Sequence, residues 1–315
     1  MFKFCSALAS SVLGFHLLLT AVEAGEEDCP RFEAAKTLGI VEDRSLTEAS
    51  GLVVSRKNPG VLWTHNDSGN APWLYALAED GSTRGIYLPT PSANVDWEDI
   101  AIGPGPTPGQ DYLYIGDIGD NRRKRPSIIV YRVPEPPIPT TLGPEPFSLP
   151  GTVALRLEYP DGERHNAETL LVDPDNADLY ILTKNKSTGV SGLYRAPFPQ
   201  NESEVSQLER VATITFSGGR SERPATGGDI SADGKTILVR TYTRGYLWTR
   251  SAGATIASTL KTPGCSVPLA IERQGESVAL TAGGQNYFTL SEGSLQPIYF
   301  YERVGTVPLL RPAGP

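Results

Sequence analysis

The chain has 315 residues and a formal net charge of −8. This acidic balance argues against a nucleic-acid partner, because phosphate binding requires a cationic surface, and the only basic run is Arg122 to Arg125. We interpret that run as a solvated loop, with a docking site for an anionic substrate as the alternative. The 32 glycines and 27 prolines indicate many tight turns between short strands.

The N-terminus has the three parts of a secretory signal. Lys3 supplies the positive start, Ala7–Ala21 is largely apolar, and Val22 and Ala24 place small residues before Gly25. We therefore expect cleavage at that point and a secreted protein; an uncleaved membrane anchor is the alternative. A second apolar stretch of about 18 residues is missing from the sequence, so we expect no membrane association after cleavage.

One sequence unit recurs five times along the rest of the chain. A short polar or acidic dipeptide precedes a strand of small and branched residues, a turn follows, and a second strand ends in hydrogen-bonding side chains. The first strands of the copies are expected at 51–55, 99–102, 169–173, 229–232 and 278–281. A supersecondary unit repeated at this period, with four strands in each copy, is typical of β-propeller blades.

The remaining strands of each blade follow in chain order. Blade one continues at 61–65, 73–78 and 84–88, blade two at 112–116, 127–133 and 152–158, blade three at 179–183, 192–196 and 208–216, blade four at 236–240, 245–250 and about 255–260, and blade five at 287–290 and 298–303.

Blade five lacks a fourth strand, and the unpaired strand 35–41 can supply it from the other end of the chain. The sequence therefore predicts an all-β fold, a five-bladed β-propeller closed by an N-terminal strand. Six blades is the alternative, if 134–160 contains a degenerate unit. The expected organisation is a signal peptide at 1–24, a segment with the closing strand at 25–44, the propeller at 45–305 and a Pro-rich tail at 306–315.

Two cysteines remain after the loss of Cys5 with the signal. In an oxidising compartment we expect Cys29 and Cys265 to form a disulfide, with Cys265 just before the innermost strand of blade five. Three Asn-x-Ser sequons predict glycosylation of Asn66, Asn185 and Asn201 if the host glycosylates.

The unusual polar residues fall at one end of the predicted strands. In a propeller, residues just before the first strand and just after the second strand of each blade meet on one face of the ring. Before the first strands stand Glu48, Asp96, Glu98, Asp99, His165, Asn166, Glu168, Asp229 and Glu276; after the second strands stand His65, Asn66, Asp67, Asp117, Asp120, Asn121, Lys184, Asn185, Arg240, Tyr242 and Glu292.

Several carboxylates at one channel mouth would repel one another unless a cation lies between them. Calcium accepts six to eight oxygen ligands in flexible geometry, whereas zinc would require Cys or His ligands at defined spacing. We expect calcium as cofactor, held by ligands drawn from Glu98, Asp99, Glu168, Asp229 and Glu276. The alternative is that these side chains cap strand ends by accepting backbone N–H bonds of neighbouring blades.

Both histidines of the mature chain, His65 and His165, fall on this same predicted face. A His near a metal-polarised ester can act as a general base at neutral pH. The predicted catalytic set is His165, His65 and Asp67, with two exposed bystander histidines as the alternative. The predicted substrate-binding residues are Asn66, Asp117, Asn121, Asn166, Lys184, Arg240, Tyr242 and Glu292.

The openings of the repeats resemble those of secreted phytase-like or esterase-like β-propellers. They read Gly51-Leu52-Val53, Trp97-Glu98-Asp99-Ile100, Ala167-Glu168-Thr169-Leu170 and Gly275-Glu276-Ser277-Val278. In outline the chain is also similar to calcium-activated nucleotidases and to arylesterase and lactonase propellers. The resemblance spans about residues 45–303 and implies a central calcium, a functional His and a disulfide between the two ends.

Two hypotheses follow. The first is a monomeric, secreted, calcium-dependent hydrolase of ester or phosphoester bonds at the channel mouth, acting on a small molecule. The second is a non-catalytic binding or structural propeller that recognises a glycan or a protein through its loop face.

Overall fold

The structure is a computed structural model that describes residues 29–138, 141 and 146–305. The predicted signal peptide at 1–24 and tail at 306–315 lie outside the described residues. Among the described residues, no helix is long and apolar enough to cross a bilayer.

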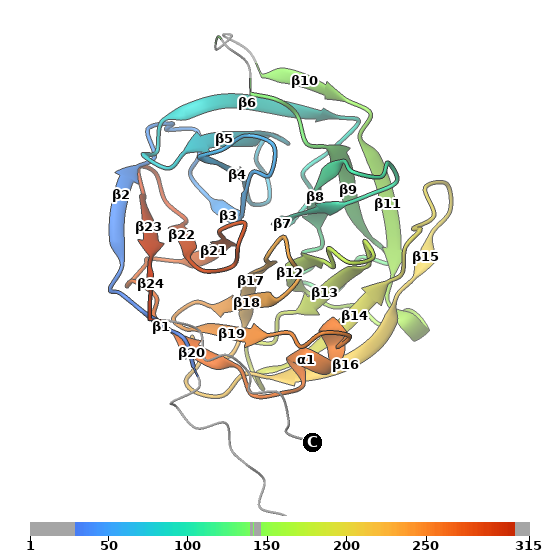
Figure 1. Ribbon diagram of the computed structural model, residues 1–315. Coiled ribbons are helices and arrows are strands. Elements are labelled where there is room, and N and C mark those ends of the chain that lie inside the picture. The colour runs from blue at the N-terminus through green and yellow to red at the C-terminus, as the bar shows by residue number, and fades with distance from the viewer. Residues whose placement is uncertain (1–28, 139–140, 142–145, 306–315) are drawn as a thin grey trace, which may run out of the picture.

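Five antiparallel blades surround a common axis (Figure 1), and the prediction of a five-bladed propeller is confirmed. From the innermost strand outward, blade one contains β3 (Ala49–Val54), β4 (Val61–Asn66), β5 (Leu74–Ala78) and β6 (Thr83–Thr90), and blade two contains β7 (Trp97–Pro104), β8 (Asp111–Asp117), β9 (Ile128–Pro134) and β11 (Val153–Glu158). Blade three contains β12 (Ala167–Val172), β13 (Leu179–Thr183), β14 (Val190–Ala196) and β16 (Glu209–Thr215). Blade four contains β17 (Ala225–Ile230), β18 (Thr236–Thr241), β19 (Gly245–Thr249) and β20 (Cys265–Val267), and blade five contains β21 (Gly275–Leu280), β22 (Tyr287–Ser291), β23 (Pro297–Tyr301) and β2 (Lys36–Ile40).

The N-terminal strand β2 closes blade five, as predicted, by antiparallel pairing with β23. The turn between β5 and β6 of blade one lies directly against β2. Gly39 has no room for a Cβ because the Asp80 backbone occupies that space, and Gly81, at a φ of +88°, meets the Ile40 backbone in the same way. The backbone N–H of Glu42 donates to the Gly81 carbonyl at 3.1 Å, so β2 also connects blade five to blade one.

Residues 255–260 differ from the prediction. They were expected to form the outer strand of blade four, but the structure has a short helix, α1 (Ile256–Leu260), and β20 takes the outer position. The reason is local: the Thr255 hydroxyl accepts a hydrogen bond from the Ser258 backbone at 3.0 Å and caps the helix. Cys265 therefore lies in β20 of blade four and not just before the innermost strand of blade five.

The long connection after β9 does not form a sixth blade. Its described part contains β10 (Phe147–Pro150), which pairs in parallel with β6, followed by β11. A second parallel addition, β15 (Ser206–Gln207), extends blade two beyond β11, a 3₁₀ turn lies at Pro160–Gly162, and β1 (Arg31–Phe32) pairs with β24 (Arg303–Val304). The described residues thus form five blades, two of them with an extra outer strand.

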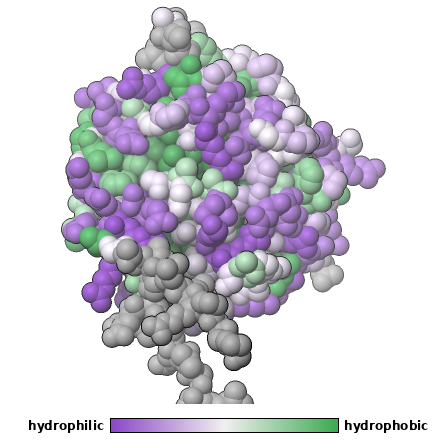
Figure 2. All heavy atoms as spheres, in the orientation of Figure 1, coloured by the Kyte–Doolittle hydropathy of each residue, from purple (hydrophilic) through white to green (hydrophobic). Residues whose placement is uncertain are grey.

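The core lies between the blades. Blades two and three, for example, enclose Tyr114, Leu155, Leu170 and Ile181, all fully buried. The burial of these apolar side chains is the main favourable term that holds neighbouring blades together. Figure 2 shows that hydrophilic residues cover much of the face seen in Figure 1, with hydrophobic residues gathered toward its upper left.

The predicted disulfide joins Cys29 to Cys265, with a Cα–Cα distance of 5.5 Å and a sequence separation of 236 residues. Replacing both cysteines by Ala should lower the free energy of unfolding by up to about 5 kcal/mol, because so long a loop loses its closure constraint in the unfolded chain. Denaturant titration of the variant and of the oxidised parent measures the difference. Equal stabilities would contradict a stabilising role.

Candidate functional site

Each of the five innermost strands has a register irregularity near its first residues. The irregularities fall between residues 49 and 52, 97 and 99, 167 and 169, 225 and 227, and 275 and 277. A β-bulge turns the extra residue away from the regular pleat and is common next to functional sites. In three blades that residue is a glutamate, namely Glu98, Glu168 and Glu276, each at most 3% exposed.

The last residues of the second strands pair with the first residues of these innermost strands. Trp97 pairs with Asp117, Ala167 with Thr183, and Gly275 with Ser291. The residues that follow the second strands therefore lie at the same end of the ring as the three glutamates. Four of these five following residues are polar: Asp67, Lys184, Tyr242 and Glu292.

Together these residues form a group at the channel mouth that we call the mouth cluster: Asp67, Asp96, Glu98, Glu168, Lys184, Glu276 and Glu292. Within it, oxygens of Asp67, Asp96 and Glu98 lie within 4.8 Å of one another, and so do those of Asp67, Glu276 and Glu292. Asp67 belongs to both groups of three. This arrangement offers hard oxygen ligands from several blades to one cation.

The ammonium group of Lys184 lies among the predicted calcium ligands. The Lys184 ammonium forms an ion pair with Glu168 and is 3.4 Å from Glu276 Oε1. It also lies 4.9 Å from the centroid of the Tyr242 ring. Burial lowers the pKa of Lys184, while Glu276 and Glu98 oppose that shift. Lys184, predicted to bind substrate, is thus a counter-ion of Glu168 and Glu276.

The remaining carboxylates of the mouth cluster have raised pKa values. Burial, and then repulsion from Asp67, raise the pKa of Glu98 well above its ordinary value of 4.5, and Lys184 opposes them. Burial raises the pKa of Asp67 to about 7, with further contributions from Glu276, Asp96 and Glu48, although a hydrogen bond from the Ser68 backbone lowers it. Burial and the contact with Glu276 raise the pKa of Glu292 to about 9. A bound cation would relieve this repulsion.

Asp99 and Asp229, both predicted as calcium ligands, instead cap strands. Asp99 accepts from the backbone N–H of Ile100 and from that of Leu170 in blade three, both at 2.9 Å. Asp229 accepts from Ile230 and from Leu280 in blade five, both at 2.8 Å. In each carboxylate Oδ1 accepts from its own strand and Oδ2 from the innermost strand of the next blade, so these residues join blades, the alternative that the sequence left open.

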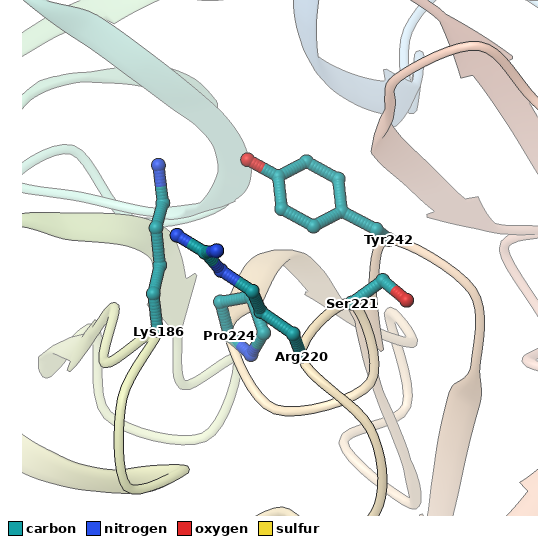
Figure 3. A pocket seen from close by; sticks show the side chains of 5 residues that line it. All are labelled: Lys186, Arg220, Ser221, Pro224 and Tyr242. Carbon is teal, nitrogen blue, oxygen red and sulfur yellow. The ribbon is translucent and has the colours of Figure 1, made fainter.

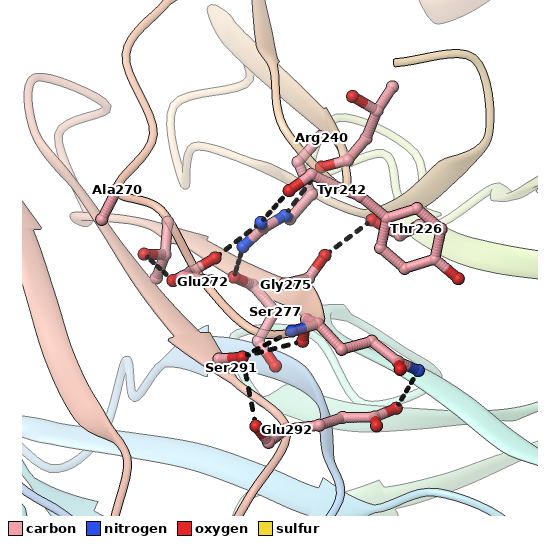
Figure 4. Close-up of polar contacts among 12 residues, drawn as sticks. Thr226, Arg240, Tyr242, Ala270, Glu272, Gly275, Ser277, Ser291 and Glu292 are labelled. Carbon is pink, nitrogen blue, oxygen red and sulfur yellow. Dashed lines mark hydrogen bonds and ion pairs between the residues drawn. The ribbon is translucent and has the colours of Figure 1, made fainter. Parts of the chain in front are cut away.

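Arg240 and Asp117 are also structural, in contrast to the prediction that they bind substrate. The fully buried Arg240 guanidinium donates to Glu272 at 2.7 Å and to the Ser277 carbonyl at 2.9 Å (Figure 4). Asp117, also fully buried, pairs with Arg125 at 2.6 Å. The polar groups of both residues are thus paired within the protein. Arg240 connects blades four and five, and Asp117 makes its ion pair within blade two.

Asn66 is a structural residue as well. Its Oδ1 accepts from the Thr47 and Glu48 backbone at 2.9 Å each, and its Nδ2 donates to the Ser45 carbonyl at 2.8 Å. Because the Asn66 side chain is 3% exposed and its amide is bonded within the protein, the structure gives no support to glycosylation or substrate binding there. The other two sequons differ, since Asn185 is half-buried and Asn201 is exposed.

Asn166 and Asn121 lie beside the mouth cluster. The Asn166 amide donates to Glu168 Oε1 at 3.2 Å and accepts from the Asp120 backbone at 2.6 Å, so it orients Glu168. Asn121 is exposed and accepts from Asn166 at 3.4 Å. Asn166 thus positions a mouth carboxylate, and the predicted substrate contact of Asn121 stays a prediction.

Neither predicted catalytic histidine contacts the mouth cluster. His65 is fully buried against Trp97, Nδ1 lies 3.0 Å from the Asn66 carbonyl, and burial lowers its pKa to about 4. His165 Nε2 lies 3.0 Å from both Glu163 and the Tyr194 hydroxyl, outside the cluster. The general-base role therefore has no geometric support at either histidine.

Sequence reasoning missed a cavity beside the mouth. A cavity of about 360 Å³ is lined by Lys186, Arg220, Ser221, Pro224 and Tyr242 (Figure 3). A second cavity, of about 300 Å³, is lined by residues that include Glu48, Gln274 and Glu292. The segment 217–224 lies between blades and was assigned to no element, although its two arginines before β17 were a visible signal.

Comparison with known proteins assigns the chain to no family. No protein-family model matches the chain, and no curated protein matches it. A solved structure that is similar, the β-propeller domain of Cps50 (Swd1) from Myceliophteria thermophila, is 12% identical, with a TM-score of 0.41, over 81% of this chain and 70% of that chain. At that level of similarity the comparison carries no argument about the fold or the site.

The two capping aspartates should matter for stability and not for cation binding. Asp99→Asn leaves one backbone N–H facing an amide NH₂, so we expect the free energy of unfolding to fall by about 1–3 kcal/mol. Calorimetric calcium titration of the same variant should give the affinity of the parent. A large loss of calcium affinity would return Asp99 to the ligand set.

The raised pKa of Asp67 predicts a pH dependence in the presence of chelator. Its folded pKa of about 7 exceeds the ordinary value of 3.8, so its contribution to stability is complete below 3.8 and is lost as the pH rises through about 7. Asp67→Asn should therefore flatten the decline in melting temperature over that window. Parallel pH profiles of parent and variant would contradict the assignment.

Proposed function

We propose that the protein is a calcium-dependent hydrolase of ester or phosphoester bonds, with its reaction centre at the channel mouth. The proposal rests on the convergence of four carboxylates, Asp96, Glu98, Glu276 and Glu292, on a fifth, Asp67. Such a group is costly to bury without a cation, and calcium suits several carboxylate oxygens in irregular geometry.

The proposed ligands differ from the set expected from sequence alone. They are Asp67, Asp96 and Glu98, with Glu276 on the other side of Asp67; Glu292, beside Glu276, stays protonated and outside the ligand set. Asp99 and Asp229 are excluded because their oxygens accept backbone hydrogen bonds, and Glu168 is excluded because it pairs with Lys184 and lies in neither group of three. Calcium, when bound, would polarise a substrate oxygen and lower the pKa of a coordinated water.

Side chains of the protein would donate a proton to the leaving group and hold the carboxylates of the mouth cluster in place. Glu292, whose pKa is raised to about 9, holds a proton near neutral pH and can donate it to a leaving oxygen. Lys184 holds Glu168 and Glu276 in place, and Tyr242 covers Lys184 on its ring face. Neither histidine has a part in this scheme, because both side chains contact residues outside the mouth cluster.

A second candidate function is a non-catalytic propeller that uses the same face to bind a glycan or a protein. The placement of His65 and His165 favours this candidate, because it removes the acid–base residues first expected. Both candidates keep the cation site, so turnover distinguishes them.

Calorimetric titration of chelator-treated protein should show calcium binding below millimolar concentration. Asp67→Asn should weaken that binding at least tenfold and abolish hydrolysis of an ester and phosphoester panel, because Asp67 belongs to both groups of carboxylates. Glu79→Gln, at an exposed turn, is the matched control and should behave as the parent.

Absence of binding at millimolar calcium would refute the proposal. Calcium binding without turnover on any substrate of the panel would leave the binding candidate in its place.

A further inference from the structure

The cavity beside the mouth is built from two loops and one wall shared with the mouth cluster. Lys186 lies on the loop after β13, whereas Arg220, Ser221 and Pro224 lie on the segment before β17. Figure 3 shows the Lys186 and Arg220 side chains running to the same side, with the Tyr242 hydroxyl pointing toward them. Tyr242 is the shared wall, because its ring also contacts Lys184.

Neighbouring residues hold the two loops together. The Arg223 guanidinium donates to the Gly218 carbonyl at 2.9 Å and to the Ser187 carbonyl at 2.8 Å, so one side chain joins both loops. Glu222 pairs with Arg244 at 2.7 Å and accepts from the Gly219 backbone. The charged groups of Arg223 and Glu222 are therefore used in fixing the cavity wall.

Lys186 and Arg220 have a different environment. Within the described part of the chain, neither side chain takes part in an ion pair, and both are exposed. A guanidinium and an ammonium from different loops thus face one cavity without a carboxylate between them. Guanidinium groups bind tetrahedral oxyanions through parallel N–H donors, and an ammonium adds a second positive charge.

The size of the cavity and its surroundings limit the ligand. About 360 Å³ suits a small molecule. A polyanion such as a nucleic acid would be repelled by the mouth carboxylates next to the cavity and by the net charge of −8. A carboxylate would balance only one of the two cations, whereas a phosphate monoester dianion balances both.

We propose that this cavity binds the phosphoryl group of a small organic phosphate, with Lys186 and Arg220 as its cationic contacts and the organic part against Tyr242 and Pro224. Binding at the cavity stands on its own geometry, but the consequence for catalysis rests on the proposed function. In that case the substrates of the mouth cluster are phosphoesters and not neutral esters.

The test uses the purified protein and phenyl phosphate, titrated calorimetrically in EGTA at low ionic strength. The parent should bind phenyl phosphate at millimolar concentration or below, and should not bind neutral phenyl acetate. The double variant Lys186→Gln with Arg220→Gln should bind phenyl phosphate at least tenfold more weakly, and added salt should weaken binding by the parent.

The matched control is Lys261→Gln with Arg210→Gln, which removes the same charge from exposed positions outside the cavity. Its affinity for phenyl phosphate should stay within twofold of the parent. Equal losses in both double variants would mean that net charge, and not the cavity, attracts the ligand, and would overturn the inference. Absence of binding by the parent, or equal binding of phenyl acetate, would overturn it as well.

A calcium titration of the same variants separates this inference from the proposed function. Loss of phosphate binding with a normal calcium isotherm supports two adjoining sites. Phosphate binding that depends on Lys186 and Arg220 in a protein that neither binds calcium nor turns over substrate would keep the cavity and refute the hydrolase. Calcium-dependent turnover that the double variant leaves unchanged would refute the cavity instead.

Discussion

The pairing of β2 with β23 is the constraint on which the rest of the structure depends. An open row of blades would expose the edge of blade five, and its innermost strand would not be held beside that of blade one. Because β2 comes from the N-terminal end of the chain, the pairing fixes both ends of the propeller at one blade, and the Cys29–Cys265 bond joins the same end to blade four. Only in a closed ring do carboxylates from blades one, two and five reach one mouth.

Closing the ring brings carboxylates of several blades close together. Two kinds of interaction compensate their negative charge. Asp99 and Asp229 each accept one backbone N–H from their own strand and one from the adjacent blade. At the mouth, Lys184 neutralises Glu168 and Glu276, but the group around Asp67 keeps raised pKa values. The difference in bonding partners explains why some carboxylates of the innermost strands join blades while others are candidate cation ligands.

The mouth and the neighbouring cavity have opposite charges and share the wall formed by Tyr242. A carboxylate cluster that suits a cation lies beside a cavity that presents Lys186 and Arg220. This juxtaposition fits a substrate with an anionic group, since a bound cation and the two side chains would attract the same molecule. The loop segment 217–224 supplies three of the residues that line this cavity.

The amino-acid sequence by itself determined the blade count, the closing strand and the cysteine pair, because strand periodicity, a missing fourth strand and an even number of cysteines are local or countable features. It also placed Glu98, Glu168 and Glu276 at one end of the ring, since strand polarity alone decides that. Which carboxylates cap strands and which remain free depended on bulge register and on partners from other blades. The internal partners of His65, Arg240 and Asn66 could not be foreseen for the same reason. Residues at a strand end are equivalent in sequence, and only packing against the neighbouring blade decides whether a side chain faces the mouth or the interior.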